Sequence, residues 1–140
     1  MRFKHIFTTI LAALSLTSCG DIIEPDGTWD PMVWKADVKT TKHNDAYSVP
    51  ATGGELIFSC KNYSKPWIAD ALTSEQLYST PDEQLNYNTI TAEWFKAEVK
   101  DNILTVTFDS NQTTEERPLK LTVTAGDIFY TFTFLQSASK

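Results

Sequence analysis

Residues 95–108 read FKAEVKDNILTVTF, and they carry the clearest structural signal in the chain. Apolar residues recur at every second position on both sides of Asp101-Asn102. That spacing is typical of strands with one buried and one exposed face. Asp and Asn tolerate the positive φ angles of tight turns, so the pair predicts a hairpin turn. The segment therefore predicts two antiparallel strands joined by that turn.

The same period of two extends outward from this hairpin through most of the chain. It predicts strands near residues 32–38, 55–62, 66–69, 119–123 and 128–134. Turn and breaker residues such as Pro50 and Gly53-Gly54 separate them. About seven short strands divided by turn signals predict an all-β fold, a single antiparallel β-sandwich. The expected bulky core residues are Trp34, Phe58, Phe95, Phe108, Phe132 and Phe134.

One segment interrupts this rhythm, at about residues 70–92. It is polar, contains Pro81 and has no sustained alternation. Ser74 to Leu77 could begin a short helical turn, which Pro81 would stop. We expect one long insertion loop here, and loops of this length are often functional or disordered.

The first residues have the three parts of a secretory signal. Residues 1–5 are basic, residues 6–16 are mostly apolar, and small residues precede Cys19. The apolar run is far shorter than the ~20 residues of a membrane-spanning helix. LTSC at 16–19 resembles the lipobox of bacterial lipoproteins, which implies lipidation of Cys19 and cleavage after Ser18. We therefore expect a signal peptide at 1–18, a lipidated cysteine with a tether at 19–31, and one domain at 32–140.

Charge and cysteine content exclude several classes of function. The chain has a net charge of −6, and removal of Arg2 and Lys4 with the signal peptide would make it −8. That balance argues against nucleic acid as a partner, because nucleic acid requires a cationic face. With Cys19 lipidated, Cys60 has no disulfide partner, and its apolar neighbours favour a buried thiol. A reactive thiol is the alternative reading.

Catalytic and metal chemistry have little support in the sequence. His43 is the only histidine left after processing, and it lies in a polar segment. A Cys60–His43 nucleophile pair would need an exposed and activated thiol. One histidine and one free cysteine also exclude a zinc site of four Cys or His ligands. We therefore expect no enzyme, no catalytic residues, no metal and no cofactor.

A family resemblance joins these observations. A Gly-Gly turn precedes a strand, and Trp67 follows that strand. Trp94 precedes a run of alternating apolar residues. Asn111, Thr114 and Arg117 precede a later strand, and the last strand ends in Gln136. Over residues 33–137 this pattern resembles the BACON module of Bacteroidetes, which is found in surface lipoproteins and beside carbohydrate-active enzymes. The resemblance implies an immunoglobulin-like sandwich and a place at the outer membrane, on the cell surface. Trp67 and Trp94 are about twenty residues further apart here than in typical members.

Aromatic residues are the remaining resource for binding. Tyr78 and Tyr87 lie in the insertion among amides and carboxylates, and Trp94 falls on the polar face of its strand. These three residues are the candidate glycan contacts; the alternative is that they pin the insertion and cap the core. The leading hypothesis is a non-catalytic structural or partner-binding lipoprotein of an envelope assembly, held to the membrane by its N-terminal lipid. An accessory carbohydrate-binding lipoprotein is the alternative.

Overall fold

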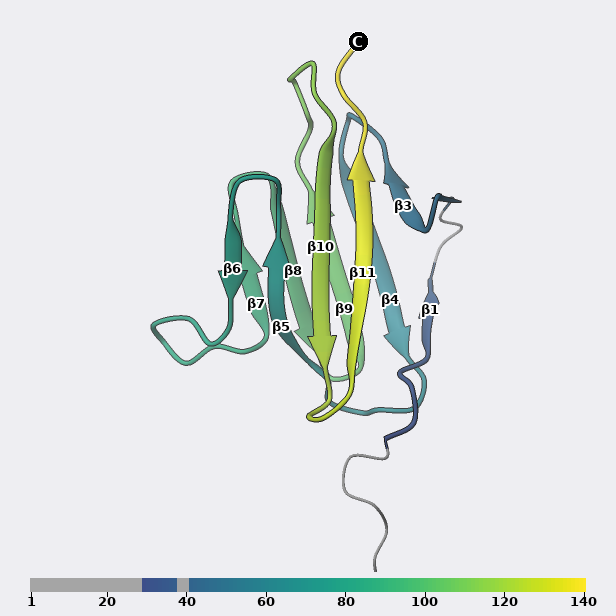
Figure 1. Cartoon of the computed structure of the whole chain (residues 1–140), viewed down its shortest axis with the longest axis vertical. Coiled ribbons are helices and arrows are strands. Elements are labelled where there is room, and N and C mark those ends of the chain that lie inside the picture. Colours follow the sequence, from purple (N-terminus) through teal and green to yellow (C-terminus); the bar gives the residue numbers. More distant parts are fainter. Residues whose placement is uncertain (1–28, 38–40) are drawn as a thin grey trace, which may run out of the picture.

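A computed structural model of the chain describes residues 29–37 and 41–140, which form two facing β-sheets (Figure 1). One sheet has the strand order β1-β4-β9-β8-β7 and the other has the order β2-β3-β11-β10-β5-β6. In chain order the strands are β1 Trp34–Ala36, β2 Lys42–His43, β3 Ala46–Val49, β4 Gly54–Cys60, β5 Trp67–Leu72, β6 Leu77–Ser79, β7 Thr89–Thr91, β8 Phe95–Lys100, β9 Ile103–Phe108, β10 Arg117–Thr124 and β11 Phe129–Gln136.

The strand order confirms the predicted immunoglobulin-like sandwich. In the immunoglobulin scheme strands A, B, E and D form one sheet and strands G, F and C form the other. Here β1-β4-β9-β8 occupy the first set of positions, and β11-β10-β5 occupy the second. All strand pairs are antiparallel except β3 with β11, which run parallel. Among the described residues no helical segment has the length and apolar character that a bilayer crossing requires.

The described residues contain eleven strands rather than the expected seven or so. The four additional strands are β2, β3, β6 and β7, each of two to four residues. A period-two pattern needs about four to eight residues to be recognisable. Strands this short therefore escape sequence analysis, and their formation depends on the longer strands that they pair with.

The hairpin predicted at residues 95–108 is confirmed, with β8 pairing antiparallel to β9. Phe95 lies opposite Phe108 and Val99 opposite Leu104, and all four side chains are buried. Asp101 adopts the positive φ of 52° that the turn requires. This hairpin supplies one wall of the core.

Aromatic side chains fill the space between the two sheets. The rings of Phe58 and Phe132, from opposite sheets, have centroids 4.7 Å apart, and Phe134 stacks on Phe132 at 6.1 Å. Offset and tilted ring pairs at such distances stabilise a core beyond the effect of area alone. Of the expected core residues, Phe58, Phe95, Phe108, Phe132 and Phe134 are buried, and Trp34 is half-buried against them.

Residues 70–92 are more regular than the expected long loop, and the helical turn that Ser74 to Leu77 could have begun does not form. The segment completes β5, turns at residues 73–76 into β6, and reaches β7 after a loop at residues 80–88. The Thr73 hydroxyl accepts hydrogen bonds from the backbone N–H groups of Glu75 and Gln76, at 3.3 and 3.0 Å. This local bonding makes a hairpin turn where the sequence also allowed a helix start.

At the end of the sandwich that carries the C-terminus, the buried Asn111 holds the β9–β10 connection in place (Figure 1). Its side-chain amide donates to the carbonyls of Glu115 and Ser137, at 2.8 and 3.0 Å. Its side-chain oxygen accepts from the backbone and hydroxyl of Thr113, at 3.0 and 2.6 Å. One side chain thus ties this long loop to the last strand.

We expect Asn111→Ala to destabilise the domain by roughly 2–4 kcal/mol, because it removes the four hydrogen bonds that this buried side chain makes. The neighbouring exposed Gln112→Ala is the matched control and should change stability by less than about 0.5 kcal/mol. Urea denaturation followed by tryptophan fluorescence measures both. Equal stability of the two variants would contradict the role assigned to Asn111.

Candidate functional site

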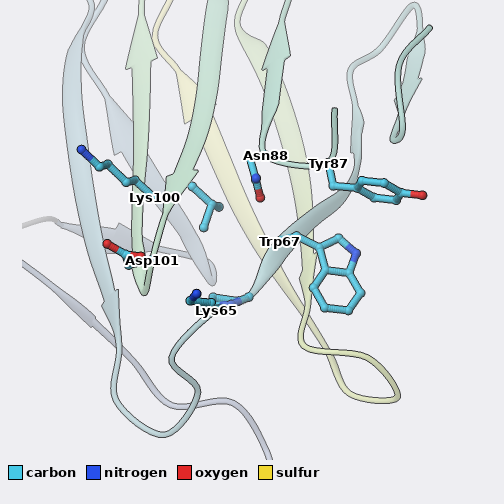
Figure 2. Close-up of a pocket in the computed structure, with 8 residues that line it drawn as sticks. Lys65, Trp67, Tyr87, Asn88, Lys100 and Asp101 are labelled. Atoms are coloured by element: carbon cyan, nitrogen blue, oxygen red, sulfur yellow. The ribbon is translucent and has the colours of Figure 1, made fainter. Parts of the chain in front are cut away.

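A hollow of about 710 Å³ opens at the other end of the sandwich, which we call the loop-end hollow (Figure 2). The β4–β5, β6–β7 and β8–β9 connections meet there. In antibody variable domains the loops at one end of the sandwich form the binding surface. Its side walls carry Lys65, Trp67, Tyr87, Asn88, Lys100 and Asp101, and Pro66 and Val99 complete the lining.

Two aromatic residues form one side of the hollow. Trp67, the first residue of β5, is half-buried, and Tyr87 is 44% exposed. Figure 2 shows both rings on the same side, with the Tyr87 hydroxyl pointing outward. The backbone N–H of Ile68 donates to the carbonyl of Tyr87 at 3.0 Å, so the two aromatic residues are held next to each other.

The loop that carries Tyr87 is braced by its own polar side chains. The Asp82 carboxylate accepts hydrogen bonds from the backbone N–H groups of Gln84 and Asn86, both at 2.9 Å. The Asn86 side chain in turn accepts from the N–H of Asn88 at 2.8 Å. Such side-chain-to-backbone bonds fix a loop without regular secondary structure. Tyr87 is therefore presented from a defined loop conformation.

Polar and charged groups form the rest of the lining. Lys65, Asn88, Lys100 and Asp101 are exposed. The carbonyl of Asn88 accepts from the N–H of Val99 at 2.8 Å, which joins the loop to the end of β8. Figure 2 shows Lys100 and Asp101 across the hollow from the aromatic pair. Aromatic rings together with a few hydrogen-bonding groups are a common lining of small-molecule sites.

The chain enters the domain at this same end. The Trp29 ring stacks on Tyr63 with centroids 6.1 Å apart, and Asn62 binds both the carbonyl of Pro31 and the N–H of Val33. The Tyr63 hydroxyl donates to the carbonyl of Asp30 at 2.6 Å. Burial, and to a smaller extent the neighbouring Asp30 and Cys60, raises the pKa of Tyr63. Residues 29–33 thus lie against the sandwich, whereas the predicted signal peptide, Cys19 and residues 20–28 of the tether fall outside the described residues.

The three aromatic residues singled out from the sequence do not meet in one site. Tyr87 lines the loop-end hollow, whereas Tyr78 packs edge-on against the buried Phe95 at 5.8 Å. Trp94 contacts Phe95 at 5.1 Å and lies five residues before Val99, so it is about 17 Å along β8 from the hollow. Tyr78 and Trp94 are both half-buried against the core. This arrangement agrees with the alternative that these residues pin the insertion and cap the core.

Trp94 instead borders a smaller hollow of about 340 Å³, which we call the acidic hollow. The Arg117 guanidinium lies over the Trp94 ring at 5.3 Å. Four carboxylates also line this hollow: Glu75, Glu93, Glu115 and Glu116. It belongs to the opposite end of the sandwich from the loop-end hollow.

The residues considered for catalysis and metal binding do not form a reactive site. Cys60 is buried in β4, and His43 is exposed in β2 of the other sheet. The Cys60 thiol lies 3.7 Å from the side-chain oxygen of Asn62. Across residues 29–37 and 41–140, no three His, Cys, Asp or Glu side chains gather as metal ligands would.

The sequence did not single out Trp67 as a binding residue; it placed Trp67 in a strand and in the pattern of the family resemblance. The signal was present in Lys65-Pro66-Trp67, where a charged residue and an aromatic residue flank a proline at the end of a loop. Its partners Tyr87 and Lys100 are distant in sequence, and only the fold brings them together.

The fold and the hollow define an immunoglobulin-like β-sandwich domain with a candidate binding site at its loop end. Among solved structures it is similar to the NMR structure of a protein from Bacteroides thetaiotaomicron, at 32% identity and a TM-score of 0.68. The match covers 86% of this chain and 98% of that one. The chain belongs to the same family as that Bacteroides protein. No family model matches the chain, and neither does any curated protein.

Proposed function

We propose that this protein is a non-catalytic lipoprotein of the bacterial envelope that binds carbohydrate at the loop-end hollow. The observation that carries the proposal is the pairing of Trp67 and Tyr87 in one hollow with hydrogen-bonding side chains. Sugars present C–H faces that pack on aromatic rings and hydroxyl groups that pair with amides and charged groups. Trp and Tyr suit such partly wet surfaces because each has an apolar ring and a polar group.

The composition of the hollow supports binding rather than hydrolysis. Most glycosidases require two carboxyl groups that flank the scissile bond. Asp101 is the single carboxylate in the lining. Histidine, cysteine, serine and threonine are absent from that lining, so it also lacks the usual nucleophile and base pairs.

The cell-envelope location rests on the N-terminal sequence and on the resemblance to BACON modules of surface lipoproteins. The family member from Bacteroides thetaiotaomicron supports an origin in the same bacterial phylum as the BACON modules. We propose attachment to the outer membrane through lipid on Cys19, with the domain on the cell surface.

The binding proposal predicts that Tyr87→Ala and Trp67→Ala each weaken glycan binding about five- to tenfold, because stacking on a ring contributes roughly 1–1.5 kcal/mol. Leu85→Ala is the matched control, since Leu85 lies in the same loop and is 73% exposed. Calorimetry of the full chain in detergent against a panel of neutral and acidic oligosaccharides gives the affinities. Trp67→Phe keeps an aromatic ring and should retain most of the binding if Trp67→Ala perturbs folding.

Binding that survives both alanine substitutions would place the glycan elsewhere on the molecule. If no oligosaccharide in the panel binds the unaltered chain, the carbohydrate proposal is wrong.

The anchor proposal predicts that the protein extracted from bacterial membranes begins at Cys19 and carries at least two acyl chains. One acyl chain binds membranes only marginally, so stable attachment needs two. Intact-mass spectrometry of the extracted protein measures both features. Cys19→Ser should release the chain from the membrane fraction, and a membrane-bound form that still begins at Met1 would contradict lipid anchoring.

A structural or protein-binding module of an envelope assembly is the second candidate. It is favoured by Leu72 and Leu77, which lie directly opposite each other on β5 and β6 and are 45% and 57% exposed. Adjacent exposed leucines are more typical of a contact surface than of a solvated strand pair. Affinity capture from outer membranes that recovers no stable partner would count against this candidate.

A further inference from the structure

We infer that the ligand of the loop-end hollow is an acidic sugar, one whose carboxylate interacts with lysine side chains at the rim. This inference rests on the proposed binding function and specifies its ligand class. The chain carries a net charge of −6, yet the lining of the hollow has two lysines, Lys65 and Lys100, and one carboxylate, Asp101. The lining of the hollow therefore carries net positive charge, whereas the chain as a whole carries net negative charge.

Neither lysine is neutralised by a neighbour in the part of the chain that the structure describes. The ion pair found there joins Lys96 to Glu98 at 3.5 Å, and both residues lie on the exposed face of β8 that also carries Lys100. Lys65 and Lys100 form no such pair, although Asp101 follows Lys100 directly. Two unpaired cations are available to a ligand without first breaking an internal interaction.

A third lysine extends the positive rim. Lys61 lines a shallow neighbouring depression that shares Lys65 and Asp101 with the loop-end hollow. Asp30 and Asp127 also belong to this end of the sandwich, but neither lines either depression. The positive charge is thus local to the hollow and its margin.

The acidic hollow at the opposite end of the sandwich provides an internal comparison. There four glutamates surround the single cation, Arg117, which lies over Trp94. The two aromatic hollows of this domain therefore differ in the sign of their charge. An anionic ligand would be repelled from one and attracted to the other.

The arrangement of the walls fits a sugar that carries one carboxylate. A pyranose ring packed on Trp67 would have Asn88 and Asp101 within the same hollow for its hydroxyl groups. Figure 2 shows Lys65 between the aromatic pair and Asp101, and Lys100 extending away on the far side. Lysine is a point charge on a flexible stem of four carbons, so both side chains can turn toward a carboxylate without a change in the backbone.

The test compares oligogalacturonate with its methyl ester, which has the same sugar ring and linkage but no charge. We expect the full chain in detergent to bind oligogalacturonate at least tenfold more tightly than the ester at low salt. High salt should remove most of that difference, because exposed charge pairs are screened. Calorimetry at the two salt concentrations gives the affinities, and alginate and hyaluronate oligosaccharides extend the test to other uronic acids.

Substitution of the lysines assigns the effect to the hollow. Lys65→Gln and Lys100→Gln should each weaken binding of the acidic oligosaccharide about three- to fivefold, and together about tenfold. Lys120→Gln is the control, because Lys120 is an exposed residue of β10 outside the hollow. None of these substitutions should change binding of the methyl ester, and circular dichroism confirms that each variant folds.

The possible results distinguish a failure of the acidic-sugar assignment from a failure of the carbohydrate-binding proposal on which it rests. Equal affinity for the acid and its ester, unchanged by the lysine substitutions but lost in Tyr87→Ala, would overturn the acidic-sugar assignment and leave carbohydrate binding intact. Preference for neutral oligosaccharides would do the same. No binding of any charged or neutral sugar would overturn both.

Discussion

The contact between Phe58 of β4 and Phe132 of β11, with ring centroids 4.7 Å apart, joins the two sheets at the centre of the domain. Phe134 packs against both of these rings, at 6.0 and 6.1 Å. Because all three side chains are almost completely buried, their packing sets the spacing and relative orientation of the sheets. The two ends of the sandwich depend on that spacing, since each hollow is lined by residues from strands or connections of both sheets.

The loop-end hollow illustrates this dependence. Trp67 belongs to β5 of the six-stranded sheet, whereas Val99 and Lys100 belong to β8 of the five-stranded sheet. A register shift between Thr122 and Val123 interrupts the pairing of β10 with β5 just before it reaches Trp67. Such bulges bend a strand and redirect its side chains, often beside functional sites. The long pairing of β10 with β11 keeps the rest of that sheet regular, so the irregularity is confined to the edge that borders the hollow.

The sequence pattern predicts the fold correctly but does not identify which residues form the candidate site. Alternating residues identified β8, β9, β10 and β11, because each of these strands has six to eight residues and one buried face. They could not identify β6 or β7, which have three residues each. Among the candidate binding residues Tyr87 lines the hollow, while Tyr78 and Trp94 pack against Phe95. Aromatic composition alone does not distinguish a ring that covers the core from one that faces a ligand, because that difference depends on contacts between strands distant in sequence.

The central claim is that ligand binds at the loop end of the sandwich and not at the hollow beside Trp94. A two-dimensional ¹H–¹⁵N NMR titration of the full chain in detergent with oligogalacturonate tests it most directly, because each tryptophan contributes its own indole signal. The account predicts saturable shifts of the Trp67 indole and of the Asn88 and Lys100 backbone amides, with the Trp94 indole unchanged. Shifts centred on Trp94 and Arg117, or shifts spread evenly over the domain, would contradict it.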